Sequence, residues 1–163
     1  MKTFYTLTLL AVLLATQTLF AAPKPDDADA LRGVTTGKVL FDINMADPKK
    51  MTLYLAVIRE TVDDLKRQGV EPDVILAFRG LSVRLISKDR EAMDLTDFEY
   101  LDRVAAQLDD LRSQGVRMEA CSVATRLFKV DNATLLEGIK PVGNTFVSLT
   151  GYQAQGYANI PIY

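Results

Sequence analysis

The chain has 163 residues with one cysteine, no histidine and no tryptophan, and its 19 basic and 21 acidic side chains leave a net charge of −2. Without histidine there can be no Ser-His-Asp triad, Cys-His pair or histidine-bound zinc, and a single cysteine excludes an intramolecular disulfide or a redox pair of cysteines. The balanced charge offers no basic field for nucleic acid, so no nucleic-acid partner is expected.

Residues 1–22 have the pattern of a cleavable signal peptide. One basic side chain precedes an apolar run at residues 7–14, and Ala21 and Ala22 supply small residues for cleavage. A membrane anchor is the alternative, but the run is well short of the ~20 apolar residues that span a bilayer. We therefore expect export to the periplasm, with no stable membrane insertion once the peptide is removed.

After the signal peptide we expect an exposed leader at residues 23–37 and one domain at residues 38–163. The leader has little periodic hydrophobicity, whereas the domain is long enough to bury a core. The domain opens with a short apolar run at residues 39–44, which suits a buried strand.

The first predicted helix has Asp47 as its N-cap and Pro48 at its first position. It ends at Gly69, a residue type that readily adopts the left-handed conformation of helix C-termini. Along this helix, apolar residues recur at spacings of four and three: Met51, Leu55, Ile58, Val62 and Leu65.

A second buried strand is predicted at residues 73–78, followed by a short helix at 81–87 and a polar connection at 88–96. A second long helix begins near Asp97 and ends at Gly115. Its inner face consists of apolar residues at helical spacing: Phe98, Leu101, Ala105, Leu108 and Leu111.

Residues 117–121 form the predicted third strand, and residues 145–150 and 157–162 are predicted to complete a five-stranded sheet. Buried strands that alternate with long helices indicate a parallel sheet with helices on both faces. The predicted fold class is therefore α/β, a three-layer α/β/α domain with a mostly parallel five-stranded sheet of flavodoxin- or Rossmann-like topology.

Open parallel sheets bind ligands beyond the carboxyl ends of their strands. Candidate ligand-binding or reactive residues stand at the ends of the first three predicted strands: Asp42, Asn44, Arg79, Gly80, Cys121 and Ser122. We expect Ser122 to cap a short helix, so that free amides and Arg126, one turn along, favour the thiolate form of Cys121. Cys121 is thus the candidate reactive group, and no metal site or cofactor is predicted.

These residues also have structural interpretations. Free cysteine is among the most buried residue types and often acts as a small hydrophobic side chain. Asp42 is equally suited to capping or to a salt bridge, and Arg79 to a surface position. An unpaired cysteine in an oxidising compartment is nevertheless a liability unless it is shielded or used, so both interpretations of Cys121 stay open.

Two segments of the C-terminal half carry a more specific pattern. Residues 115–121 read Gly-Val-Arg-Met-Glu-Ala-Cys, and residues 153–160 read Gln-Ala-Gln-Gly-Tyr-Ala-Asn-Ile. They resemble the Gly-Val-x-aromatic-x-x-Cys strand end and the Gln-x-x-Gly-Tyr-x-x-Ile tail of the DsrE/DsrF-like family, in particular its exported members. The resemblance covers most of residues 38–163.

This resemblance implies a three-layer α/β/α fold that often assembles as trimers or hexamers, so a homo-oligomer is expected. Characterised relatives relay sulfur as a persulfide on a cysteine, and Cys121 is similar in placement to that cysteine. Many relatives have histidine before the glycine that closes the second strand, where this chain has Arg79. The arginine weakens a proton-transfer role at this position and leaves anion binding open.

The leading hypothesis is an exported sulfur-handling protein, sulfurtransferase-like if active, that accepts and donates sulfane sulfur on Cys121. Its partners would be a sulfur donor or acceptor protein, or a small sulfur compound. The alternative is a non-enzymatic module for small-ligand binding or oligomeric assembly, in which Cys121 is a buried structural residue.

Overall fold

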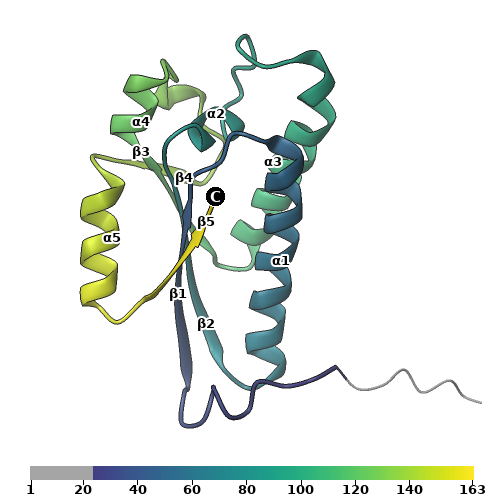
Figure 1. Cartoon of the computed structure of the whole chain (residues 1–163), viewed down its shortest axis with the longest axis vertical. Coiled ribbons are helices and arrows are strands. Elements are labelled where there is room, and N and C mark those ends of the chain that lie inside the picture. Colours follow the sequence, from purple (N-terminus) through teal and green to yellow (C-terminus); the bar gives the residue numbers. More distant parts are fainter. Residues whose placement is uncertain (1–23) are drawn as a thin grey trace, which may run out of the picture.

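The computed structural model describes residues 24–163, so the predicted signal peptide lies outside the described residues. Figure 1 shows the arrangement of the helices and strands. In chain order the elements are β1 (Thr36–Ile43), α1 (Pro48–Arg67), β2 (Glu71–Phe78), α2 (Ser82–Leu85), η1 (Leu95–Asp97), α3 (Phe98–Ser113), β3 (Arg117–Cys121), α4 (Ser122–Leu127), η2 (Asn132–Thr134), β4 (Ile139–Val142), α5 (Thr145–Ala154) and β5 (Ala158–Ile162).

The five strands form one parallel sheet in the order β4-β3-β2-β1-β5. Helices α1 and α3 cover one face of the sheet and α5 covers the other (Figure 1). The predicted three-layer α/β/α fold with a five-stranded parallel sheet is therefore confirmed. Sequence patterning could anticipate this fold because each long helix buries one apolar stripe against the sheet.

The first predicted helix is confirmed as α1. The side chain of Asp47 accepts a hydrogen bond from the Lys50 amide at 3.0 Å, which satisfies one of the free amides at the start of the helix. Past the last turn, Gly69 has φ +78°, the left-handed conformation that lets the chain turn into β2. The capping signals in the sequence therefore marked both ends correctly.

The prediction of a strand at residues 145–150 is wrong, because these residues form the first part of α5. Asn144 caps the helix by accepting a hydrogen bond from the Phe146 amide at 2.9 Å. β-branched and aromatic residues here favour a strand locally, but the cap and the burial of Leu149 against the sheet favour the helix. The fourth strand is instead β4, whose four residues include Lys140 and Pro141.

Two apolar cores lie on the two faces of the sheet. The larger one joins the sheet to α1 and α3 and contains fully buried side chains such as Met51, Leu76 and Phe78. The smaller one joins the sheet to α5 through Leu40, Ile75, Ala77, Leu149 and Tyr157. α5 has 10 residues against 20 in α1 and 16 in α3, and on its face of the sheet Lys140, Asn159 and Pro161 of the two edge strands stay exposed.

Both edge strands contain a proline, Pro141 in β4 and Pro161 in β5. Proline has no amide proton to donate to a neighbouring strand. These positions therefore disfavour the addition of a further strand at either edge of the sheet.

Candidate functional site

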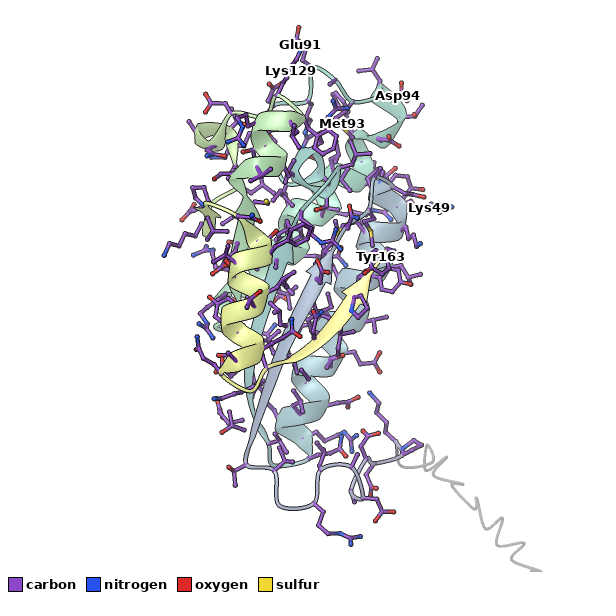
Figure 2. The ribbon with its side chains drawn as sticks, turned by 60° about the vertical axis from the view of Figure 1, so that its left-hand side comes forward. Lys49, Glu91, Met93, Asp94, Lys129 and Tyr163 are labelled. Atoms are coloured by element: carbon purple, nitrogen blue, oxygen red, sulfur yellow. The ribbon has the colours of Figure 1, made fainter. Side chains whose placement is uncertain are left out.

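The register of the sheet brings the ends of its central strands together. Ile43 pairs with Phe78, and Phe78 pairs with Ala120. The next residues along these strands, Asn44, Arg79 and Cys121, therefore form one row at the carboxyl edge, where a parallel sheet presents its ligand site. Loop residues Glu91, Met93 and Lys129 lie at the far end of the molecule, beyond this edge (Figure 2).

Cys121 lies at the junction of β3 and α4. It occupies the N-cap of α4 in an extended conformation, φ −70° and ψ 112°, so that Cys121 and not Ser122 caps this helix. The helix begins one residue earlier than expected, because the ladder between β3 and β4 ends with the pair Cys121 and Val142. The side chain is only 5% exposed and packs against Val83 and Ala124.

The sulfur of Cys121 is surrounded by hydrogen-bond donors. The Thr145 amide donates to Sγ at 3.5 Å. Burial acts to raise the pKa of the thiol, but hydrogen bonds from the Thr145 hydroxyl and from the amides of Thr145, Ala124 and Val123 outweigh it. The pKa of Cys121 is therefore lowered, which favours the reactive thiolate.

Thr145 is a residue of this site that the sequence patterns did not reveal. Its side chain is 1% exposed, and Oγ1 has no hydrogen-bond partner of good geometry within the described residues. The hydroxyl proton is therefore free to turn toward the sulfur, where it acts to lower the pKa of Cys121. The prediction of a strand at residues 145–150 did not place Thr145 beside Cys121, because Thr145 reaches the sulfur as the first residue of α5.

Arg79 and Asp42 form an ion pair with two hydrogen bonds, at 2.6 and 2.9 Å. The side chains are 18% and 6% exposed, respectively. The guanidinium carbon also lies 5.5 Å from the ring centre of Phe146 and 5.8 Å from that of Tyr163. Hydrogen bonding to Asp42 raises the pKa of Arg79, so the arginine remains charged and its charge is largely balanced by the carboxylate.

Asn44 and Gly80 lie against each other beside this ion pair. Gly80 has φ +57°, and a Cβ atom there would come within 2.1 Å of Asn44 Oδ1. The Asn44 amide donates to the carbonyl of Ile162 at 2.9 Å. Both residues therefore shape the edge of the sheet. Arg126 is exposed on α4 and takes no part in these contacts.

Comparison with known proteins identifies the domain. A model of the DsrE/DsrF-like family matches residues 38–162. The chain belongs to this family. An uncharacterized protein from Aquifex aeolicus is 21% identical over 125 residues, which cover 76% of this chain and 55% of that protein. The chain thus matches only about half the length of this relative.

Two solved structures have the same fold as this DsrE/DsrF-like domain. A protein of unknown function, MTH1491 from Methanobacterium thermoautotrophicum, is 24% identical with a TM-score of 0.62, covering 77% of this chain and 99% of its own. The ychN protein from E. coli is 14% identical with a TM-score of 0.58, covering 78% of this chain and all of its own. At these identities the similarity establishes the fold alone.

A second group of polar residues lies below Cys121 in this DsrE/DsrF-like domain. Glu119 is 8% exposed, and its Oε1 accepts a hydrogen bond from the Tyr152 hydroxyl at 2.6 Å. Burial first, and then the contact with Glu119, raise the pKa of Tyr152 to about 12. The sequence did not single out Glu119, although its alternation with Cys121 along the strand places both side chains on one face.

Arg117 lies on the same face, two residues before Glu119. It donates to Asp73 and to the Tyr157 hydroxyl, both at 2.6 Å, and its guanidinium lies over the ring of Tyr152. These contacts join β2 and β3 to the last turn of α5 and to the segment between α5 and β5. They fasten the C-terminal end of α5 to the sheet, whereas Thr145 lies at the opposite end of this helix.

Metal and membrane sites have no support in the part of the chain that the structure describes. Residues 24–163 contain no group of three or more acidic or cysteine side chains placed to hold a metal ion. Among the helices of this region, none is both long and apolar enough to cross a membrane.

Proposed function

We propose that this DsrE/DsrF-like protein is a sulfur carrier that holds sulfane sulfur as a persulfide on Cys121. The observation that carries the proposal is the placement of the sulfur, at the end of a central strand and among four donors that lower the pKa of the thiol. The association of the family with sulfur relay supports it.

In the proposed reaction, the Cys121 thiolate attacks the outer, sulfane sulfur of a persulfide or polysulfide donor. A sulfur–sulfur bond forms on Cys121 while the bond between that sulfur and the rest of the donor breaks, and the donor leaves as a thiolate or shorter polysulfide. No external oxidant is needed, because the transferred sulfur keeps its oxidation state. Attack by an acceptor thiolate on the outer sulfur of Cys121 reverses the step.

The polar residues around the cysteine have different parts in this proposal. Amides at the start of α4 and the Thr145 hydroxyl stabilise the negative sulfur of the thiolate and of the persulfide. Arg79 is already paired with Asp42, so it would contact an anionic donor through hydrogen bonds rather than through net charge. Arg126 is exposed and would attract such a donor from solvent.

Export to the periplasm and assembly as a homotrimer or homohexamer belong to the same proposal. A carrier must meet a donor and an acceptor, which would be a protein or a small sulfur compound. The prolines in β4 and β5 argue against assembly by pairing of edge strands. Subunits would instead meet through helices or through the part of the sheet that α5 leaves uncovered.

Mass spectrometry of the intact protein tests sulfur carriage. After exposure to inorganic polysulfide and removal of the excess, the wild-type chain should gain whole sulfur atoms, and Cys121→Ser should gain none. Loss of the added mass on treatment with a thiol reductant distinguishes a persulfide from a sulfinic acid, whose mass is nearly the same. Equal labelling of both proteins would reject Cys121 as the carrier.

A second candidate function is a ligand-binding or assembly module with a structural cysteine. It is favoured by the 5% exposure of Cys121 and by its packing against Val83 and Ala124. Alkylation of the native protein separates the two candidates. Fast modification that persists below neutral pH supports the carrier, whereas protection until the protein unfolds supports the module.

A further inference from the structure

Glu119 and Cys121 are neighbours on one face of β3. Residues two apart along a strand project to the same side, and their Cα atoms are separated by about 6.6 Å. Both side chains are buried beneath α5, which contacts Cys121 through Thr145 and Glu119 through Tyr152. The thiol and the carboxylate therefore lie along one seam between β3 and α5, which we name the β3–α5 seam.

Glu119 is the one carboxylate among the four described side chains that have a buried polar atom without a hydrogen-bond partner. Oε1 accepts from Tyr152, but Oε2 is buried and has no hydrogen-bond donor within residues 24–163. Its Cα partner on β4 is Lys140, an exposed residue. A buried carboxylate held by one neutral donor is screened poorly, so its charge acts on nearby groups more strongly than a surface charge would.

The charged and titratable groups that face this pair come from every adjoining element. On β3 itself lies Arg117, which is engaged with Asp73. The groups on the other elements are Arg79 on the β2 side, Tyr152 on α5, Lys140 on β4 and Arg112 at the end of α3. The charges of Arg79 and Arg112 are balanced by Asp42 and Asp109. Glu119 is the one carboxylate on β3, the strand that ends in Cys121.

We propose that Glu119 is a positioning residue that opposes ionisation of Cys121 and so keeps part of the cysteine in the thiol form at neutral pH. The negative charge of Glu119 disfavours a second negative charge on the sulfur. Hydrogen bonds from Thr145 and α4 act in the opposite direction. Compared with the same cysteine without the Glu119 charge, the Cys121 thiolate forms less readily but is the stronger nucleophile once formed.

The inference concerns the ionisation of the thiol and does not require that Cys121 carry sulfur. A failure of polysulfide labelling would count against the proposed function and would leave this inference intact. A failure of the titration described next would count against the inference alone.

The test is the pH dependence of the thiol in wild type and in Glu119→Gln, which removes the charge and keeps the shape. Ultraviolet absorbance of the thiolate gives the pKa, and exchange with a small neutral disulfide such as dithiodipyridine gives the rate. The pKa should fall by about one to two units in the variant, the size of shift that a like charge on a neighbouring buried side chain produces.

The curves of disulfide-exchange rate against pH for wild type and Glu119→Gln should cross near the pKa of the thiol. Below the pKa, Glu119→Gln should react about three- to fifteen-fold faster, because more of it is thiolate. Above the pKa it should react about three- to ten-fold slower, because a thiolate of lower pKa is a weaker nucleophile. A purely structural role for Glu119 would change access to the sulfur and would shift both limbs in the same direction.

Two further variants complete the experiment. Glu119→Leu combined with Tyr152→Phe removes the carboxylate and its donor together, so no buried polar group is left unpaired, and it should lower the pKa of the thiol as Glu119→Gln does. This variant decides the matter if Glu119→Gln does not fold. Glu71→Gln, the same change at the exposed start of β2, is the matched control and should leave the thiol unchanged. An unchanged or raised thiol pKa in the first two variants, or an equal shift in the control, would overturn the inference.

Discussion

Arg79 donates two hydrogen bonds to Asp42 across the neighbouring strands β2 and β1, from Nε to Oδ1 at 2.6 Å and from Nη2 to Oδ2 at 2.9 Å. Paired bonds of this kind fix the plane of the guanidinium. The rings of Phe146, in α5, and Tyr163, after β5, lie against that group. One ion pair thus connects four elements that meet at the carboxyl edge of the sheet.

Replacing Asp42 with Asn should destabilise the fold substantially. The substitution leaves the charge of Arg79 mostly buried without its partner, and the loss of one member of a buried pair typically costs about 3 kcal/mol. Urea denaturation measures the change in free energy of unfolding. The control is Asp63→Asn, which breaks an exposed pair with Arg59 and should cost less than about 1 kcal/mol. Similar losses in the two variants would contradict this account of the ion pair.

Replacing Thr145 with Val should raise the pKa of Cys121. The variant keeps the shape of the side chain but removes the hydroxyl that helps to lower that pKa. A hydrogen bond to a charged group is worth about 1.5 kcal/mol, so a rise of about one unit is expected. The dependence of alkylation rate on pH reports the shift. Thr150→Val, on the exposed side of α5, should leave the profile unchanged.

Asp73 should make the stability of the domain sensitive to acid. Burial acts to raise the pKa of Asp73, but hydrogen bonds from Tyr157 and Arg117 and the nearby positive charges lower it overall. A carboxyl group whose pKa is lower in the folded state stabilises the fold above its unfolded pKa of about 3.9, and that stabilisation is lost as the pH falls through the folded value.

Urea unfolding between about pH 2 and pH 6 tests this link. Wild type should lose stability as the pH falls, and Asp73→Asn should show a smaller loss because it has no proton to take up at this site. If the free energy of unfolding falls equally steeply with decreasing pH in both proteins, Asp73 contributes nothing to the acid sensitivity.

Replacing Gly80 with Ala should destabilise the turn after β2. The backbone has φ +57°, and the new Cβ would lie 2.1 Å from Asn44 Oδ1. Adopting this conformation costs a residue other than glycine about 1 kcal/mol or more before the clash is counted. The double variant Gly80→Ala with Asn44→Ala should recover the part due to the clash and keep the part due to the backbone. Equal stability of the single and double variants would show that the contact is unimportant.

Local signals explain which features could be predicted from the sequence. The cap at Asp47, the stop at Gly69 and the apolar spacing along α1 all act within a few residues of one another, and the structure confirms them. The position of Cys121 at a strand end was predictable for the same reason. Residues 145–150 were misassigned because their local preference for a strand is overridden by a cap and by packing against distant strands.

The sequence by itself determined the alternation of strands and helices as far as the third strand, and the position of the one cysteine at the carboxyl edge of the sheet. Only the tertiary structure decided what surrounds that cysteine. The Thr145 amide reaches Cys121 over 24 residues of chain, and Tyr152 reaches Glu119 over 33. Contacts at such separations depend on how α5 packs against the sheet, and no pattern within a short stretch of sequence encodes them. The acidity of the thiol is therefore a property of the packed fold, because Thr145 reaches the sulfur only there.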